Sequence, residues 1–375
     1  MPPFLKLLVE PKDPKRIVPR EREDGRVDHY NVESIENVLI GQVLGIISET
    51  KDGEGIYLEG DPSSLAGENT SVTKDGKSII SLVNGYVVIE GGKLCVKDTY
   101  EVEDVDFKTS NVTFVGRLVV KGSIRKGFSA IANEIVVFGD IEDAHVKATN
   151  GISVRGGIVG ARTFGIESFS LIKAGWIQES LVIARSNIYV KKGIFNSEVL
   201  SGESVLVDGE IVGGHIRAKD IIVAKEIGGH GLSLVELSVG IDPTLEREEK
   251  DLLDKLGILE RRFDELEKIV NYLSGKGKLS AKEKMELIKA KSDMVSLRRT
   301  IGKRKKELED VRERLKKVSP NPYIRVWGNL YQGVRVNILG SSIDIEKNMK
   351  DVKIYFRDGK IIVEENFGTK GGQET

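Results

Sequence analysis

The stretch "GDIEDAHVKATNGISVRGGIVGA", residues 139–161, decides the fold. It contains five glycines, and its apolar residues are too sparse to form the stripe of an amphipathic helix. A segment that turns this often is either disordered or one copy of a repeated unit, and a fixed period in the surrounding sequence separates the two cases. Isoleucine does recur with such a period on both sides of Ile141.

The repeat has a period of about seventeen residues. Steps of seventeen, once nineteen and once sixteen, connect Ile124, Ile141, Ile158, Ile177, Ile194, Ile211 and Ile227. The same kind of step connects Leu118, Ile135, Ile152, Leu171, Ile188, Val205 and Ile221. It also connects Val120, Val137, Val154, Lys173, Val190, Val207 and Val223, among which Lys173 is the only polar residue. A fourth series is Ser129, Val146, Thr163, Val182, Val199, Ile216 and Leu232.

Glycine keeps a register of its own, two residues after the Val120 series. Its members are Gly122, Gly139, Gly156, Gly175 and Gly209. We interpret this register as a corner at which the backbone either adopts unusual dihedral angles or has no room for a side chain.

These series predict a mainly β fold, a right-handed parallel β-helix of about seven turns of 17 residues. Each turn has three inward anchors, separated by six, five and six residues. Left-handed β-helices are built from strict six-residue units, so the shorter side favours the right-handed form. The isoleucine ladder is expected to be structural core, because stacked turns bury like side chains on one another.

Composition limits the possible partners. The chain has 375 residues, 39% of them hydrophobic, and a formal net charge of −1, so the whole protein is not an electrostatic binder of nucleic acid or acidic lipid. The single cysteine, Cys95, excludes an intramolecular disulfide framework and a cysteine-rich zinc site, and we expect a buried thiol. No secretion signal or long apolar run is found, so we expect a cytoplasmic protein without a membrane span.

Residues 242–319 predict an antiparallel coiled-coil hairpin. Leucines recur every seven residues at Leu252, Leu259, Leu266 and Leu273, and a second helix begins at Ser280, which forms a capping box with Glu283. The basic run "RRTIGKRKKELEDVRERLKK" suggests a docking surface for a partner protein. Its candidate residues are Arg298, Arg299, Lys303, Lys305 and Lys306.

The basic run also raises the alternatives of nucleic-acid binding and of contact with a membrane surface. The first arm, residues 242–273, has ten acids and six bases, whereas the second, residues 280–317, has fourteen bases and seven acids. Opposite charge on paired arms favours a self-complementary hairpin over both alternatives. The basic run has no interleaved aromatic residue, which further weakens the case for single-strand binding.

The remaining sequence divides into flanking parts. Residues 1–110 are rich in strands and turns but lack the repeat, so they predict a separate β-rich domain. The β-helix is expected over residues 111–241, the hairpin over 242–319, and strands that complete or cap the β-helix over 320–366. The tail, residues 367–375, is expected to be disordered.

The order of these parts resembles the bacterial flagellar assembly protein A family, first catalogued as a domain of unknown function. The resemblance rests on "VDFKTSNVTFVGRLVVKGSI" (105–124), "IGGHGLSLVELSVGIDP" (227–243), the inserted hairpin and "VWGNLYQGVRVNIL" (326–339), and extends from about Asp24 to about Gly340. It implies a cytoplasmic bacterial protein with a right-handed β-helix, a protruding helical hairpin and a role in flagellar placement or assembly. The β-helix is also similar to the C-terminal domain of the septum-site inhibitor of cell division.

Candidates for chemistry are few. His215 and His230 are fifteen residues apart and could share a metal across two turns, but no acidic or cysteine partner is in register, so surface positions are favoured. The only candidate base for acyl transfer is His145, next to the inward Val146, and Asp104 and Asp106 form an acidic pair. We therefore expect no catalytic residue, metal or cofactor.

The sequence favours a non-enzymatic scaffold in flagellar assembly or polar placement. Its partners would be other proteins, such as flagellar or cell-pole components, or a further copy of the chain. Two alternatives stay open: a β-helix enzyme acting on acyl groups or glycans, and nucleic-acid binding through the basic helix.

Overall fold

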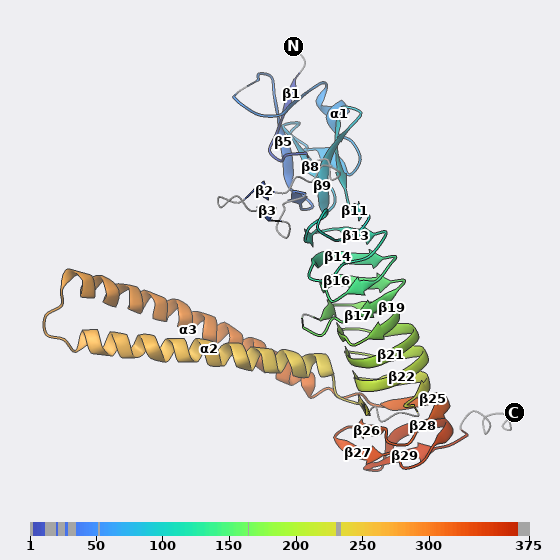
Figure 1. Ribbon diagram of the computed structural model, residues 1–375. Helices are drawn as coiled ribbons and strands as arrows, with labels where there is room; N and C mark the ends of the chain where they lie inside the picture. Colours follow the sequence, from blue (N-terminus) through green and yellow to red (C-terminus); the bar gives the residue numbers. More distant parts are fainter. Residues whose placement is uncertain are drawn as a thin grey trace.

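The computed structural model describes residues 3–11, 35–51, 53–163, 165–229 and 234–366, together with two short paired strands, β2 (Arg20–Glu21) and β3 (Val27–Asp28). The tail expected to be disordered, residues 367–375, lies outside this range. Figure 1 shows three parts: a β unit at the N-terminus, a rod of stacked strands, and a helical hairpin. The hairpin leaves the rod near the rod's C-terminal end and projects sideways.

The N-terminal unit consists of two small antiparallel sheets around one core. The strand orders are β6-β1-β5-β8-β7 and β10-β9-β4. Leu5, Val38, Leu44, Ile79 and Leu94 are fully buried in this core. The elements are β1 (Phe4–Leu7), β4 (Asn37–Val38), β5 (Val43–Ser48), β6 (Tyr57–Glu59), α1 (Pro62–Leu65), β7 (Thr70–Val72), β8 (Ser78–Ser81), β9 (Gly85–Glu90) and β10 (Lys93–Lys97).

A parallel β-solenoid follows, with about eight turns over residues 99–239. Its first strand lies ahead of residue 111, the start indicated by the repeat. Its described strands and those that follow the hairpin form one 19-stranded sheet. They are β11 (Thr99–Val102), β12 (Val112–Thr113), β13 (Arg117–Val120), β14 (Ser129–Val137), β15 (Ile141–Glu142), β16 (His145–Val154), β17 (Gly157–Val159), β18 (Ile166–Ser168), β19 (Leu171–Gln178), β20 (Leu181–Ala184), β21 (Ile188–Ser201), β22 (Val205–Ala218), β23 (Ile221–Ile227), β24 (Val235–Val239), β25 (Tyr323–Leu330), β26 (Arg335–Ile338), β27 (Ser341–Asp344), β28 (Met349–Arg357) and β29 (Lys360–Glu364).

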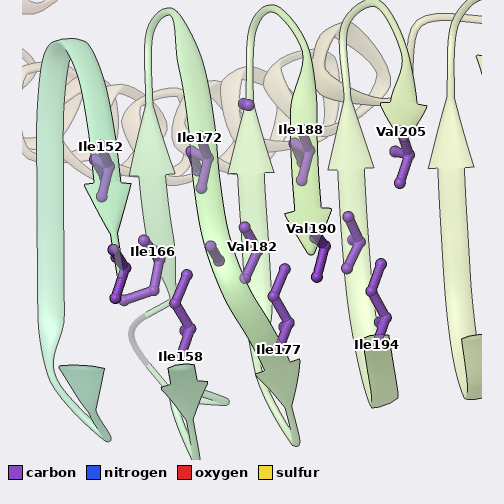
Figure 2. Close-up of a cluster of buried hydrophobic side chains, with 14 of the residues drawn as sticks. Ile152, Ile158, Ile166, Ile172, Ile177, Val182, Ile188, Val190, Ile194 and Val205 are labelled. Carbon is purple, nitrogen blue, oxygen red and sulfur yellow. The ribbon is translucent and has the colours of Figure 1, made fainter. Parts of the chain in front are cut away.

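Three inward ladders fill the solenoid, because each turn hydrogen-bonds in parallel to the next and places its apolar anchor on that of its neighbour. The isoleucine ladder has no exposed member, and Val105 extends it by one turn at the N-terminal end. Figure 2 shows Ile158, Ile177 and Ile194 on successive turns. The other two ladders pass through Ile152 and Val146. A single turn could not bury these side chains alone, so the core depends on stacking.

The register of two ladders differs from the one that the spacing predicted. Ile152 pairs with Ile172 rather than Leu171, and Ala174 rather than Lys173 takes the inward place. A shift of one residue exchanges the inner and outer faces of a strand, so Lys173 lies outside and does not interrupt the core.

The same error affects other predicted positions. The inward residues are Ala130 in place of Ser129, Ile166 in place of Thr163, and Ile222 and Ala224 in place of Ile221 and Val223. Leu232 lies outside the described residues, and Leu237 occupies that ladder position. The causes are local. Extra residues lie between Val146 and Ile166, and separate register shifts occur between Ala132 and Glu134 and between Val207 and Glu210, where an even spacing cannot place them.

The glycine register marks lack of space and not unusual dihedral angles. Gly139, Gly156 and Gly175 stack through hydrogen bonds from the amide of one to the carbonyl of the preceding one. A Cβ at Gly139, Gly156 or Gly175 would lie 2.6, 2.5 or 2.6 Å from that carbonyl oxygen, respectively, too close for any side chain. Positive φ angles occur at a different corner, which includes Gly160, Glu179 and Asn196.

Both ends of the solenoid are joined to other structure. At the N-terminal end, the rings of Tyr86, Tyr100 and Phe114 meet edge to face with centroids 5.9–6.0 Å apart, which links the N-terminal unit to the first turn. At the other end, β28 pairs antiparallel with β25 and β29 pairs with β28. These antiparallel strands cover the last parallel strand, which would otherwise be an open edge.

The hairpin consists of α2 (Pro243–Ser274) and α3 (Ala281–Leu315). Asp242 caps α2, and Ser280 and Glu283 form the predicted capping box at the start of α3. The predicted leucines Leu252, Leu266 and Leu273 are buried between the arms, while Leu259 is half-buried. The hairpin leaves after β24 and returns to β25, so it is an insertion between two turns.

Candidate docking surface on the helical hairpin

The start of α2 is fixed to the solenoid by packing. Thr244 and Leu245 are buried in its first turn, and the Asp242 carboxylate accepts hydrogen bonds from their amides at 2.9 and 3.3 Å. Ile183 and Leu200 are adjacent outward positions on β20 and β21, yet both are buried. Because α2 contacts β21, we attribute this burial to the helix lying on the outer face of the sheet.

Two arginines add charge to this attachment. Arg185 donates to the Thr244 hydroxyl at 3.3 Å and forms an ion pair with Glu248 at 2.8 Å. Arg217, on β22, pairs with Glu246. Both glutamates are in the first two turns of α2, where a carboxylate also interacts favourably with the helix dipole. The direction of the hairpin is therefore set by side chains of the rod.

Charged groups also join the two arms to each other. Lys305 pairs with Glu260 at 2.8 Å, and Arg312 pairs with Glu249 at 2.6 Å. The Arg298 guanidinium lies 5.4 Å from the centre of the Phe263 ring. These contacts between a basic α3 and an acidic α2 agree with a self-complementary hairpin.

The five predicted docking residues therefore do not form one free surface. Arg298 and Lys305 border a hollow of about 390 Å³ between the arms and serve the contact with α2. Arg299, Lys303 and Lys306 are exposed at spacings of four and three residues, which places them on one outer side of α3. Within the described residues no carboxylate forms an ion pair with any of these three.

The sequence offered Asp104, Asp106 and His145 as candidates for chemistry. The two aspartates hold turns of the backbone, and His145 lies on the outer face of its strand. Asp104 accepts a hydrogen bond from the Ser123 amide, and Asp106 accepts from the amides of Lys108 and Thr109. His145 is half-buried on the outer face of its strand, beside the buried Val146. The acidic pair thus stabilises turns of the solenoid backbone.

The spacing of His215 and His230 raised a shared metal site, which the sequence disfavoured, and this site stays untested because His230 lies outside the described residues. His215 pairs with Glu236 at 3.2 Å, while His230 and His29 lie outside the described residues. Over the part of the chain that the structure covers, no three histidine, cysteine or carboxylate side chains are grouped as metal ligands. Cys95 is buried, as expected.

A second hollow, of about 590 Å³, lies on the outer face of the solenoid near its C-terminal end. Leu206, Val223 and Trp327 line it, with Asp208 and Lys225 as its charged residues. Asp208 is the only carboxylate in this lining and no histidine contributes to it, so the hollow holds neither a pair of carboxylates nor an imidazole.

The helices of the described chain include none that is both long and apolar enough to cross a membrane. A family model for the flagellar assembly protein A β-solenoid domain matches residues 98–361. This span begins one residue before β11 and ends within β29, so it includes the solenoid and the hairpin. No curated protein and no solved structure matches the chain.

Proposed function

The chain belongs to the flagellar assembly protein A β-solenoid domain family, and from this premise we propose that it is a non-enzymatic scaffold in bacterial flagellar assembly or placement. The solenoid acts as a rigid spacer. The hairpin is the element that docks a partner protein, and the N-terminal unit is held at the opposite end of the rod.

The observation that carries this proposal is the attachment of α2. A hairpin on a flexible linker would present its surface in every direction, and binding would then cost orientational freedom. Here Arg185, Arg217 and the buried Leu200 fix the arm to the sheet at its base. Such a pre-oriented arm suits a protein whose task is to hold a partner at a set distance and angle.

The partner surface that fits best is acidic. Arg299, Lys303 and Lys306 are exposed on the outer side of α3 and have no intramolecular ion pair in the described structure. We call these three residues the basic segment. Their charges are available to carboxylates of another protein, and such complementarity raises the association rate and selects the partner.

The test is capture of partners from the native bacterium. The variant Arg299→Glu/Lys303→Glu/Lys306→Glu reverses the basic segment, and the control Lys250→Glu/Lys255→Glu/Lys268→Glu reverses three exposed cations on α2. We expect cross-linking to recover flagellar or polar components with the wild type and the control, and at least tenfold less with the first variant.

Replacement of residues 242–318 by a short Gly-Ser linker provides the second arm of the test. The Ser319 amide donates to the Gly240 carbonyl at 2.8 Å, so the two ends of the hairpin are adjacent and the rod can close without it. Unchanged capture by this deletion, or equal losses in the two charge variants, would refute the docking role. Preferential recovery of nucleic acid by the wild type would favour the rival function instead.

A further inference from the structure

A line of exposed apolar side chains lies on α3 near the tip of the hairpin. Met285, Ile288 and Val295 are 71, 66 and 72% exposed. Their spacing of three and seven residues places them on one side of the helix, and the buried Ala290 occupies the side that faces α2. These three residues therefore stabilise neither the hairpin nor its contact with the rod.

Lysines lie on both sides of this line. Lys282 and Lys289 are seven residues apart and therefore lie on one side of the line. Lys284 and Lys291 are also seven residues apart and lie on its other side. All four are exposed, and no described carboxylate forms an ion pair with them. We call the three apolar residues and these four lysines the tip face.

The acids of this region are placed elsewhere. Glu283 is held by Lys276 at 2.5 Å and by the Ser280 amide at 2.8 Å, at the start of the helix. Glu286 and Asp293 are exposed, seven residues apart, on the flank beyond Lys282 and Lys289. The tip face therefore presents apolar side chains bordered by unpaired positive charge.

We propose that the tip face binds the surface of an anionic phospholipid bilayer. In an interfacial helix the apolar side chains enter the boundary between headgroups and acyl chains, and flanking lysines extend their ammonium groups to the lipid phosphates. The tip face has this order, with apolar residues in the centre and cations at both edges. Binding to DNA or to an acidic protein would instead favour cations in the centre of the face.

Residue type and shape also favour a bilayer over a protein. All four cations of the tip face are lysines, whereas arginine and aromatic residues are the types enriched at protein interfaces. The face is the convex outer side of a helix, and the hollow found on the hairpin lies between the arms, among Glu260, Phe263 and Ile301. A convex apolar ridge suits a soft surface that deforms around it.

This inference is independent of the protein-docking role, which concerns the basic segment. Binding is measured with the purified full chain and vesicles alone, by flotation with about 30% phosphatidylglycerol in phosphatidylcholine, where anionic lipid attracts basic residues. We expect the wild type to float with these vesicles, to remain unbound with pure phosphatidylcholine, and to dissociate at high salt.

Two variants separate the apolar and electrostatic contributions. Met285→Ser/Ile288→Ser/Val295→Ser should weaken vesicle binding at least tenfold, because the apolar insertion is lost. The matched control is Leu253→Ser/Ile258→Ser on α2, whose side chains are 44 and 59% exposed, and it should bind as the wild type does. Lys282→Glu/Lys289→Glu should also weaken binding, by about fivefold or more for each charge removed.

A second measurement guards against misfolded variants. All substituted side chains are exposed, so circular dichroism should report unchanged helix content. A bimane probe at Ile288→Cys should shift to shorter wavelength on anionic vesicles, and the same probe at Ile258→Cys should not. The proposal is overturned by absent wild-type binding, by full binding of the triple serine variant, or by duplex DNA binding as tightly as the vesicles.

Discussion

Arg185 on the solenoid lies 2.8 Å from the Glu248 carboxylate on α2, and this pair joins the two architectural parts of the protein. The same guanidinium donates to the Thr244 hydroxyl, one turn earlier. One rod residue thus contacts two successive turns of the arm. The angle between arm and rod then becomes a property that side-chain substitutions on the solenoid can change.

Removal of both anchoring arginines should loosen the arm without unfolding it. In Arg185→Gln/Arg217→Gln, the buried Leu245 and Leu200 still hold the base of α2, but its charged contacts are lost. Partly exposed pairs contribute about 0.5–1 kcal/mol each, so the stability should fall only slightly. Spin labels at Val159 and Ile288 should give a broader distance distribution than in the protein with both arginines, measured by double electron–electron resonance.

The control for this experiment is Arg125→Gln, which removes a 2.7 Å pair with Glu142 elsewhere on the solenoid. Its distance distribution should equal that of the wild type. An unchanged distribution in the double arginine variant would show that apolar packing alone sets the angle of the arm.

Truncation of the isoleucine ladder should be costly. Ile158 is fully buried between Ile141 and Ile177, so Ile158→Ala leaves a cavity that rigid neighbouring turns cannot fill. We expect a loss of about 3 kcal/mol in the free energy of unfolding, measured by urea denaturation. Val159→Ala changes the adjacent outward residue and should cost less than about 0.5 kcal/mol. Equal effects of the two substitutions would contradict the assigned inner face.

The sequence predicted the architecture well because the repeat is local. The inward isoleucines follow from spacing alone, and the capping box of Ser280 and Glu283 follows from a helix-start signal. The predicted strand register is wrong at the nineteen-residue step, because periodicity does not say which corner of the turn holds the extra residues. Lys173 was thus placed inside, although the pairing puts Ala174 there.

The contacts of the hairpin, both between its arms and with the rod, could not be predicted for a different reason. Charge counts showed that the arms could pair, but not that Lys305 would reach Glu260, since that depends on how the two helices face each other. A signal for the anchor was nevertheless present. Ile183 and Leu200 are outward apolar residues seventeen apart, and such a pair on adjacent turns indicates that something covers the sheet.

Substitution in the glycine stack should destabilise the solenoid through the neighbouring turn. In Gly156→Ala the new Cβ would lie 2.5 Å from the Gly139 carbonyl oxygen, so the backbone of one turn must move. The expected cost is about 1–3 kcal/mol, seen as a lower midpoint of thermal unfolding. The control Gly277→Ala places its Cβ in open space at the hairpin tip and should leave the midpoint unchanged. An unchanged midpoint in Gly156→Ala would contradict the prediction, because it would show that neighbouring turns can accommodate the added methyl group.

The tip of the hairpin should respond to acid through Glu283. The ion pair with Lys276 and hydrogen bonds from Ser280 lower the pKa of Glu283 from 4.5 to about 2. A carboxyl group with a lowered pKa in the folded state stabilises that state above its ordinary pKa, and the contribution is lost as the pH falls toward the lowered value. The start of α3 should therefore fray between about pH 4.5 and 2.

Amide resonances of residues 281–284 should report this fraying, and Glu283→Gln should make it independent of pH in that range. Glu286→Gln, one turn later, should leave the wild-type response in place, and an identical response in Glu283→Gln would assign the fraying to another group.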